Sequence, residues 1–195
     1  VTADFQNPRE HYRRAEAAAK KIFQSGALLI SIGGDHGIPI PIMRALPADE
    51  PVTLIQIDAH MDWRDNVNGE KDGYSSPIRR ASELPFVKDI FQIGLRGVGS
   101  GREEEMEAAL NYGAHLISAY EMHDIGIEAV LKRIPDGGRF YITVDADGMD
   151  PTVMPAVNAP TPGGLTWLQI REFVHGIVKK GRVLGIDLVE ISPSF

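Results

Sequence analysis

The chain has 195 residues, of which 43% are hydrophobic and 24% are charged, as in an ordinary globular protein and unlike a disordered one. It has no cysteine, which excludes disulfides, thiolate metal sites and a cysteine nucleophile. The formal net charge of -7 disfavours nucleic acid as the main partner, and no apolar run reaches the roughly eighteen residues of a membrane helix. We therefore expect a single domain over residues 1–195, without a nucleic-acid or membrane partner and with the cytoplasm as its default location.

Apolar, β-branched runs alternate with amphipathic stretches along the chain. In chain order, the predicted elements are a helix at 8–24, strands at 27–32, 52–57 and 90–95, a helix at 101–112, a strand at 114–118, a helix at 125–133, a strand at 139–144, a helix at 166–180 and a strand at 183–189. Such apolar runs are typical of parallel strands that are buried on both faces, so the pattern predicts an α/β fold around a parallel sheet. Ligands of such sheets bind at the carboxyl ends of the strands, where we therefore expect functional residues.

Ionisable residues follow the first two predicted strands. The first strand runs into Gly33–His36, where two glycines allow a tight turn, although a lone histidine after a strand is usually structural. The second runs into Asp58, His60 and Asp62, which strand alternation would project in one direction. A solvated loop could explain Asp62 alone, whereas a cation explains all three. Carboxylates and imidazole without sulfur favour manganese or a similar divalent ion.

Acidic residues also end the last two predicted strands. Asp145 and Asp147 repeat the spacing of two residues, and Asp150 precedes a proline, where an Asx-turn is as good an interpretation as a functional role. Asp187 and Glu190 follow the final apolar run. Each could face a cationic substrate or simply be a surface acid, and the spacing does not decide between the two.

Three of these motifs, in this order, resemble the signatures of the ureohydrolase family of arginases and agmatinases. They are Gly-Gly-Asp-His at 33–36, Asp-Ala-His-Met-Asp at 58–62 and Asp-Ala-Asp-Gly-Met-Asp-Pro at 145–151. The resemblance covers nearly the whole chain. It implies a doubly wound, mainly parallel arginase-type fold with helices on both faces, two manganese ions per chain and a homo-oligomer, a trimer or a hexamer. It also implies that residues 1–195 lack the amino-terminal and carboxyl-terminal ends of a complete ureohydrolase domain.

The resemblance also implies residue roles. One manganese ion would be held by His36, Asp58, Asp62 and Asp145, and the other by Asp58, His60, Asp145 and Asp147. Asp62 and Glu190 would be catalytic, Asp62 as the proton carrier and Glu190 as the partner of the substrate guanidinium. Two metal ions that share one water lower its pKa from roughly 15.7 towards about 7, which suits hydrolysis of a guanidine to urea and an amine.

The substrate side departs from the family pattern. Tyr74 stands where the family usually has a histidine, in a segment that continues Ser75-Ser76-Pro77, and we expect Tyr74 to bind substrate. The same segment could instead just start a helix. The loop after the second motif lacks the Ser-Gly-Asn-His-like stretch of arginases, so the agmatinase-like branch is preferred. Agmatine, guanidinobutyrate and guanidinopropionate all remain open, and Arg64 or Arg79 would favour a substrate that bears a carboxylate.

Two other interpretations compete with a ureohydrolase. A histone-deacetylase-like amide hydrolase shares the topology but uses one zinc ion, so the second metal site discriminates between the two. A metal-binding or regulatory paralogue would have lost its chemistry together with the histidine at the position of Tyr74. An arginase is disfavoured by the loop after the second motif, and a plain structural α/β domain is disfavoured by the three motifs.

Overall fold

The six predicted strands form one sheet, and every neighbouring pair in it is parallel. The computed structural model describes residues 7–97 and 101–192. The strand order is β1-β6-β5-β2-β3-β4. The strands are β1 (Leu29–Ile32), β2 (Val52–Ile57), β3 (Val87–Leu95), β4 (His115–Ser118), β5 (Arg139–Asp145) and β6 (Arg182–Val189).

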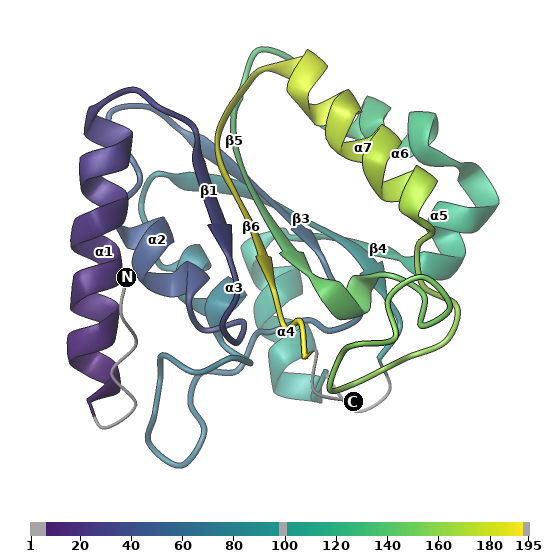
Figure 1. Cartoon of the computed structure of the whole chain (residues 1–195). Coiled ribbons are helices and arrows are strands. Elements are labelled where there is room, and N and C mark those ends of the chain that lie inside the picture. Colours follow the sequence, from purple (N-terminus) through teal and green to yellow (C-terminus); the bar gives the residue numbers. More distant parts are fainter. Residues whose placement is uncertain (1–6, 98–100, 193–195) are drawn as a thin grey trace.

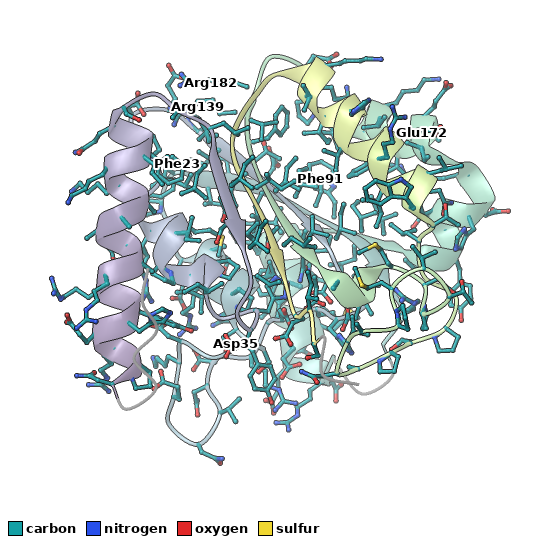
Figure 2. The ribbon with its side chains drawn as sticks, in the orientation of Figure 1. Phe23, Asp35, Phe91, Arg139, Glu172 and Arg182 are labelled. Atoms are coloured by element: carbon teal, nitrogen blue, oxygen red, sulfur yellow. The ribbon has the colours of Figure 1, made fainter. Side chains whose placement is uncertain are left out.

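Helices cover both faces of this sheet (Figure 1). One face packs against α1 (Pro8–Gln24), α2 (Pro39–Arg44), α3 (Pro77–Ser82) and α4 (Glu103–Tyr112), and the other against α5 (Ala119–Ile125), α6 (Ile127–Arg133) and α7 (Trp167–Lys180). Each face has its own hydrophobic cluster, and Figure 2 shows Phe23 of α1 on one side of the sheet and Phe91 on the α7 side. Helices of the described ranges are all too short or too polar to span a membrane.

The winding of the chain reverses between β2 and β5. From β2 the chain passes through α3 to β3 on one side, whereas from β5 it passes through α7 to β6 on the other. Because β2 and β5 are hydrogen-bonded neighbours, the two crossovers leave a crevice at their carboxyl ends. This doubly wound topology confirms the predicted fold class and indicates where a ligand would bind.

The element boundaries follow local signals, with two corrections. The capping box at Thr166 and Gln169 begins α7, and Pro77 begins α3, so the helix-start interpretation of that segment is confirmed. The helix expected at 125–133 is α6, but it begins only at Ile127, because Gly126 at φ 79° separates it from α5, a helix that the sequence analysis did not predict. The sequence analysis missed α2, a six-residue helix too short to show a helical period.

Candidate metal centre

Acids and histidines from three strand ends meet at the crevice between β2 and β5. They are the six predicted metal ligands: His36 after β1, Asp58, His60 and Asp62 after β2, and Asp145 and Asp147 at the end of β5. All are buried except His60, whose side chain is 25% exposed. Buried ionisable side chains at this density require compensating charge.

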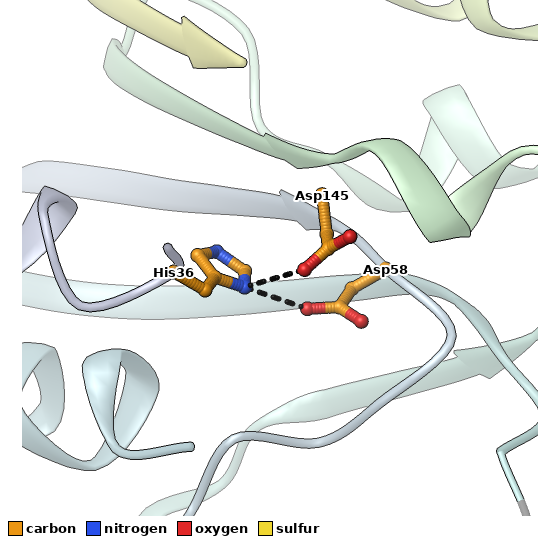
Figure 3. A group of neighbouring side chains, drawn as sticks. All are labelled: His36, Asp58 and Asp145. Carbon is orange, nitrogen blue, oxygen red and sulfur yellow. Dashed lines mark ion pairs between the residues drawn. The ribbon is translucent and has the colours of Figure 1, made fainter. Parts of the chain in front are cut away.

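The first group gathers around the imidazole of His36. Its Nδ1 lies 3.1 Å from Oδ2 of Asp58 and 3.2 Å from Oδ2 of Asp145, the two contacts drawn in Figure 3. The same nitrogen is 2.8 Å from Oδ2 of Asp62. His36, Asp58 and Asp145 are close enough to hold one metal ion, with candidate ligand atoms within 4.8 Å of one another.

The second group shares a carboxylate with the first. Nδ1 of His60 lies 2.9 Å from Oδ2 of Asp147 and 3.5 Å from Oδ1 of Asp58. Asp58, His60 and Asp147 meet the same 4.8 Å limit, so Asp58 belongs to both groups. Its Oδ2 faces His36 and its Oδ1 faces His60, which is an arrangement suited to bridging two ions.

Backbone turns, rather than strand alternation, bring these side chains together. β2 ends at Ile57, before the first of the three ligand candidates, and Asp62 has a left-handed backbone at φ 55°. The amide of His60 donates to Oδ1 of Asp58 at 2.6 Å, and the amide of Asp147 donates to Oδ1 of Asp145 at 2.9 Å. The expected convergence is therefore correct, but the reason given for it, alternation along a strand, is wrong.

Gly148 allows the two turns to touch. A Cβ at this position would lie 2.9 Å from the backbone nitrogen of Asp58 and 3.0 Å from the carbonyl carbon of Ile57. Both atoms belong to backbone, which cannot swing away as a side chain can. The glycine in the Asp-Ala-Asp-Gly motif thus lets the turn after β5 lie against the end of β2.

A buried hydrogen-bond chain orients His36. Thr143 donates its hydroxyl hydrogen to Oδ1 of Asp187 at 2.8 Å, and Tyr141 donates to Oδ2 of the same carboxylate at 2.6 Å. Since its only hydrogen goes to Asp187, the Thr143 hydroxyl must accept from Nε2–H of His36, 3.0 Å away. The lone pair of a neutral His36 is then on Nδ1 and points at the carboxylates.

The surroundings of Nδ1 of His36 indicate whether a cation fits between this nitrogen and the carboxylates. Nδ1 of His36 is buried and makes no hydrogen bond of regular geometry within the described residues, although carboxylate oxygens of Asp58, Asp62 and Asp145 surround it. A lone pair that faces three carboxylates is repelled unless a proton or a metal ion lies between them. Imidazole nitrogen and carboxylate oxygen together suit manganese, so the residues fit the predicted metal.

A second polar chain holds Asp58. Gln56 donates from Nε2 to Oδ2 of Asp58 at 2.6 Å, and the Gln92 amide donates to Oε1 of Gln56. Trp63 in turn donates from Nε1 to Oε1 of Gln92 at 2.6 Å. These buried hydrogen bonds orient the carboxylate of Asp58 so that it faces both histidines.

The crowding of like charges shifts the pKa values of the protein without metal. Burial, with the charge of Asp58, raises the pKa of Asp62 to about 7 and that of Asp145 to about 8. Burial also opposes ionisation of Asp58, but hydrogen bonds from His36 and His60 outweigh it and hold the pKa of Asp58 well below its usual value. Hydrogen bonds to Asp147 and Asp58 raise the pKa of His60 to about 11. In the absence of metal, bound protons thus supply part of the positive charge that compensates the crowded carboxylates.

A pocket of about 550 Å³ opens onto this cluster. Its lining includes Asp62 and Asp147 from the cluster, together with Glu190, Tyr74 and Arg64. Glu190 is kept at the pocket by a left-handed backbone at φ 59° and accepts a hydrogen bond from the amide of His36 at 2.8 Å. The two predicted substrate-binding residues therefore line the same space as the candidate metal ligands.

A model of the arginase family matches residues 1–195 of this chain. The chain belongs to the arginase family. It is 33% identical to a guanidinopropionase of Pseudomonas aeruginosa over 94% of this chain and 59% of that protein, and 33% identical to an agmatinase of Bacillus subtilis over 100% of this chain and 66% of that protein. The crystal structure of agmatine ureohydrolase of Thermoplasma volcanium superposes with a TM-score of 0.80 at 32% identity, covering 93% of this chain and 60% of that one. The chain thus spans about three-fifths to two-thirds of the length of these arginase-family relatives.

Two of the strand-end acids considered in the sequence analysis, Asp150 and Asp187, lie outside the cluster. Asp150 accepts from the backbone and hydroxyl of Thr152 and from the amides of Gly163 and Gly164, so its Asx-turn interpretation is confirmed. Asp187 neither lines the pocket nor lies on the surface, because it is 1% exposed beneath Thr143. Both alternatives for Asp187 were wrong, and burial raises its pKa to about 6.

Sequence reasoning missed the residues that support the cluster. Thr143, Gln56 and Gln92 are polar positions inside apolar strands, and this interruption is the signal that could have identified them. Arg96 gave no such signal. Its guanidinium donates to the carbonyl oxygens of Asp147 at 2.7 Å and Met149 at 3.1 Å, which fastens the turn after β5.

Proposed function

We propose that this arginase-family chain carries the active site of a manganese-dependent ureohydrolase, which hydrolyses a guanidino compound to urea and an amine. The observation that carries the proposal is the pair of acid and histidine groups that share Asp58 and lie beside a pocket lined by His60, Asp62 and Asp147. In this proposal, His36, Asp58, Asp62 and Asp145 hold one ion, and Asp58, His60, Asp145 and Asp147 hold the other.

The chain's own residues have distinct tasks in the proposed reaction. When bound, the two ions supply Lewis acidity that makes a water molecule at the site nucleophilic near neutral pH. Asp62 and Glu190 both line the pocket. Glu190 pairs with the cationic guanidinium and orients its carbon towards the cluster, whereas Asp62 carries a proton to the departing amine.

The substrate is a linear guanidine in this proposal. Guanidinopropionase and agmatinase, the names of two relatives, denote enzymes whose substrates carry a carboxylate and an amine, respectively, at the end opposite the guanidine. Tyr74 is 62% exposed at the pocket and can donate a hydrogen bond to either type of substrate. The guanidine end is therefore the part common to the candidates.

The test is metal analysis combined with a urea-release assay. The purified protein, loaded with manganese and desalted, is expected to retain two ions per chain and to release urea from at least one member of a panel of linear guanidines. Two ions with no urea from any guanidine would contradict the proposal and support the metal-binding paralogue. One tightly bound zinc ion, with deacylation of an amide, would support the one-metal amide hydrolase.

Three further expectations stay predictions. We propose a homo-oligomer, a trimer or a hexamer, which light scattering on the purified protein measures. A cytoplasmic location, which is the default expectation from composition, and a single ureohydrolase domain over residues 1–195 are likewise proposals.

A further inference from the structure

The pocket has one permanently positive side chain among its described lining residues. Acidic lining residues are Asp35, Asp62, Asp147 and Glu190, and the only arginine or lysine among the described lining residues is Arg64. We propose that Arg64 binds a carboxylate at the far end of the substrate, so that the preferred substrate is a guanidino carboxylic acid. This inference rests on the proposed ureohydrolase function and narrows its substrate class.

The charges of the pocket match a substrate with opposite charges at its two ends. A guanidinium is attracted to Glu190 and the acids of the cluster, and a carboxylate placed there would be repelled. Near Arg64 the preference is the opposite, because its positive charge attracts a carboxylate and repels a cation. An amine tail, which is also cationic, would instead be repelled by Arg64, and a neutral alkyl tail would offer no acceptor to the outer edge of the Arg64 guanidinium.

Contacts outside the pocket hold Arg64 in position. Nε of Arg64 lies 3.2 Å from Oε1 of Glu105, a buried carboxylate whose Oε2 accepts from the amide of Arg102 at 3.0 Å. The backbone of Arg64 donates to the carbonyl oxygen of Ser75 at 3.0 Å, which joins it to the segment that carries Tyr74. Glu105 does not line the pocket, so it orients the guanidinium from behind.

The outer edge of the Arg64 guanidinium is available for a ligand. Within residues 7–97 and 101–192, its two terminal nitrogens donate no hydrogen bond, and the side chain is 25% exposed. Two parallel N–H groups of an arginine match the two oxygens of a carboxylate, which a lysine cannot reproduce. The free edge therefore suits a carboxylate better than a single hydroxyl or amide oxygen.

The test compares substrates that differ only in their tails. The manganese-loaded protein is assayed with guanidino acids of two to five methylenes, with agmatine and with an uncharged alkylguanidine, in the wild type, Arg64→Gln and Arg64→Lys. We expect the wild type to prefer a guanidino acid. Because a hydrogen-bonded ion pair is lost, Arg64→Gln should lower kcat/KM for that acid at least about tenfold, mainly through KM, and leave the alkylguanidine within about twofold. Arg64→Lys should restore part of the loss.

Arg79→Gln is the matched control. Arg79 lies on α3, its Nε is 3.7 Å from Oε1 of Glu83, and it is not part of the pocket lining. This variant removes the same charge from the same protein and should leave the substrate ranking unchanged.

Binding without turnover keeps the inference separate from the proposed function. Calorimetry with the guanidino acid and with the alkylguanidine measures affinity whether or not urea is released. Urea release with equal preference for all three tails, or an unchanged ranking in Arg64→Gln, would overturn the role of Arg64 while the ureohydrolase stands. If no guanidine is hydrolysed, the proposed function fails, and tail-independent binding in the wild type would overturn this inference as well.

Discussion

Asp58 is the residue on which both halves of the candidate centre depend. One of its oxygens faces His36 and the other faces His60, and each also accepts a hydrogen bond, from Gln56 and from the amide of His60. Asp147, in contrast, belongs to the second group only. The family resemblance assigns a bridging role to Asp145 as well, but in this geometry only Asp58 is common to both groups, so bridging by Asp145 stays a prediction.

Removal of the shared carboxylate should affect both ions. We expect Asp58→Ala to retain no manganese after desalting and to lose all measurable turnover, whereas Asp147→Ala should retain one ion per chain. Inductively coupled plasma mass spectrometry of the desalted proteins measures the number of manganese ions per chain, and circular dichroism verifies that each variant is folded. Asp136→Ala removes an 83% exposed acid and should keep both ions. Two ions in Asp58→Ala would refute the shared-ligand geometry.

Thr143 acts on the centre through His36. Thr143→Val keeps the shape of the side chain but removes the hydroxyl that accepts from His36 and donates to Asp187. We expect manganese affinity to fall roughly 10-fold to 100-fold, as for other partners of metal-binding histidines, and stability to fall by about 1–3 kcal/mol because Asp187 loses a donor. Manganese titration and urea unfolding measure the two effects. Thr53→Val is the control, because Thr53 lies near the amino end of β2, and it should leave manganese affinity unchanged.

At the scale of elements, the centre depends on two turns that are packed against each other. The turn after β2 carries Asp58, and the short 3-10 turn η1 (Ala146–Gly148) after β5 carries Asp147. The amide of Ala59 donates to Oδ1 of Asp147 at 3.1 Å, which links the turns directly. The strands place the turns side by side, and the backbone contact at Gly148 sets how closely they approach.

A side chain at Gly148 should push the turns apart. In Gly148→Ala the new Cβ meets backbone atoms of Asp58 and Ile57 at 2.9–3.0 Å, so we expect a loss of about 1–3 kcal/mol in stability from overpacking. Manganese affinity should fall too, because Asp58 and Asp147 separate. Denaturant unfolding and metal titration report these changes. Gly73→Ala is the control, since a Cβ there has no heavy atom within 4 Å; equal behaviour of the two variants would contradict the role of the close approach.

At the scale of the molecule, the sheet concentrates negative charge at one end. Asp35 lies at that end, near the carboxyl ends of β1 and β6, whereas Arg139 and Arg182 lie at the opposite end (Figure 2). Strand β5 begins at Arg139 and strand β6 begins at Arg182. Because parallel strands present all their carboxyl ends at one edge, motifs far apart in the chain add their charges at the crevice.

Proton release should therefore accompany metal binding. In the protein without metal, the pKa values of Asp62 and Asp145 are raised to about 7 and about 8, above their values in the unfolded chain. Carboxyl groups shifted in this direction contribute stability that is present at low pH and is lost as the pH rises through 7 to 8. Manganese replaces the protons, so its stabilising effect should grow over the same range.

Thermal unfolding with and without manganese tests this linkage. We expect the increase in Tm on adding manganese to be larger at pH 8 than at pH 6, and chelation by EDTA to abolish it at both. Asp58→Ala is the control, because it lacks the shared ligand and should show no increase at either pH. An increase that is the same at pH 6 and pH 8 would contradict displacement of these protons.

The sequence by itself determined the strands, the layered fold and the six residues of the cluster. Buried parallel strands have a strong apolar signal, and the rule that ligands bind at their carboxyl ends indicated Asp58 and Asp145, whereas the family resemblance assigned His36. The turn residue Asp150 was also identified correctly as an alternative, because an acid before proline has a local role.

Only the tertiary structure decided how these residues act on one another. The hydrogen bonds from Thr143 to Asp187 and from Gln56 to Asp58 connect polar side chains that a linear pattern cannot pair. Likewise, the free edge of Arg64 depends on a contact with Glu105, on a helix far along the chain. The physical reason is that chain periodicity encodes burial, whereas orientation and charge compensation depend on neighbours that folding alone brings within hydrogen-bond distance.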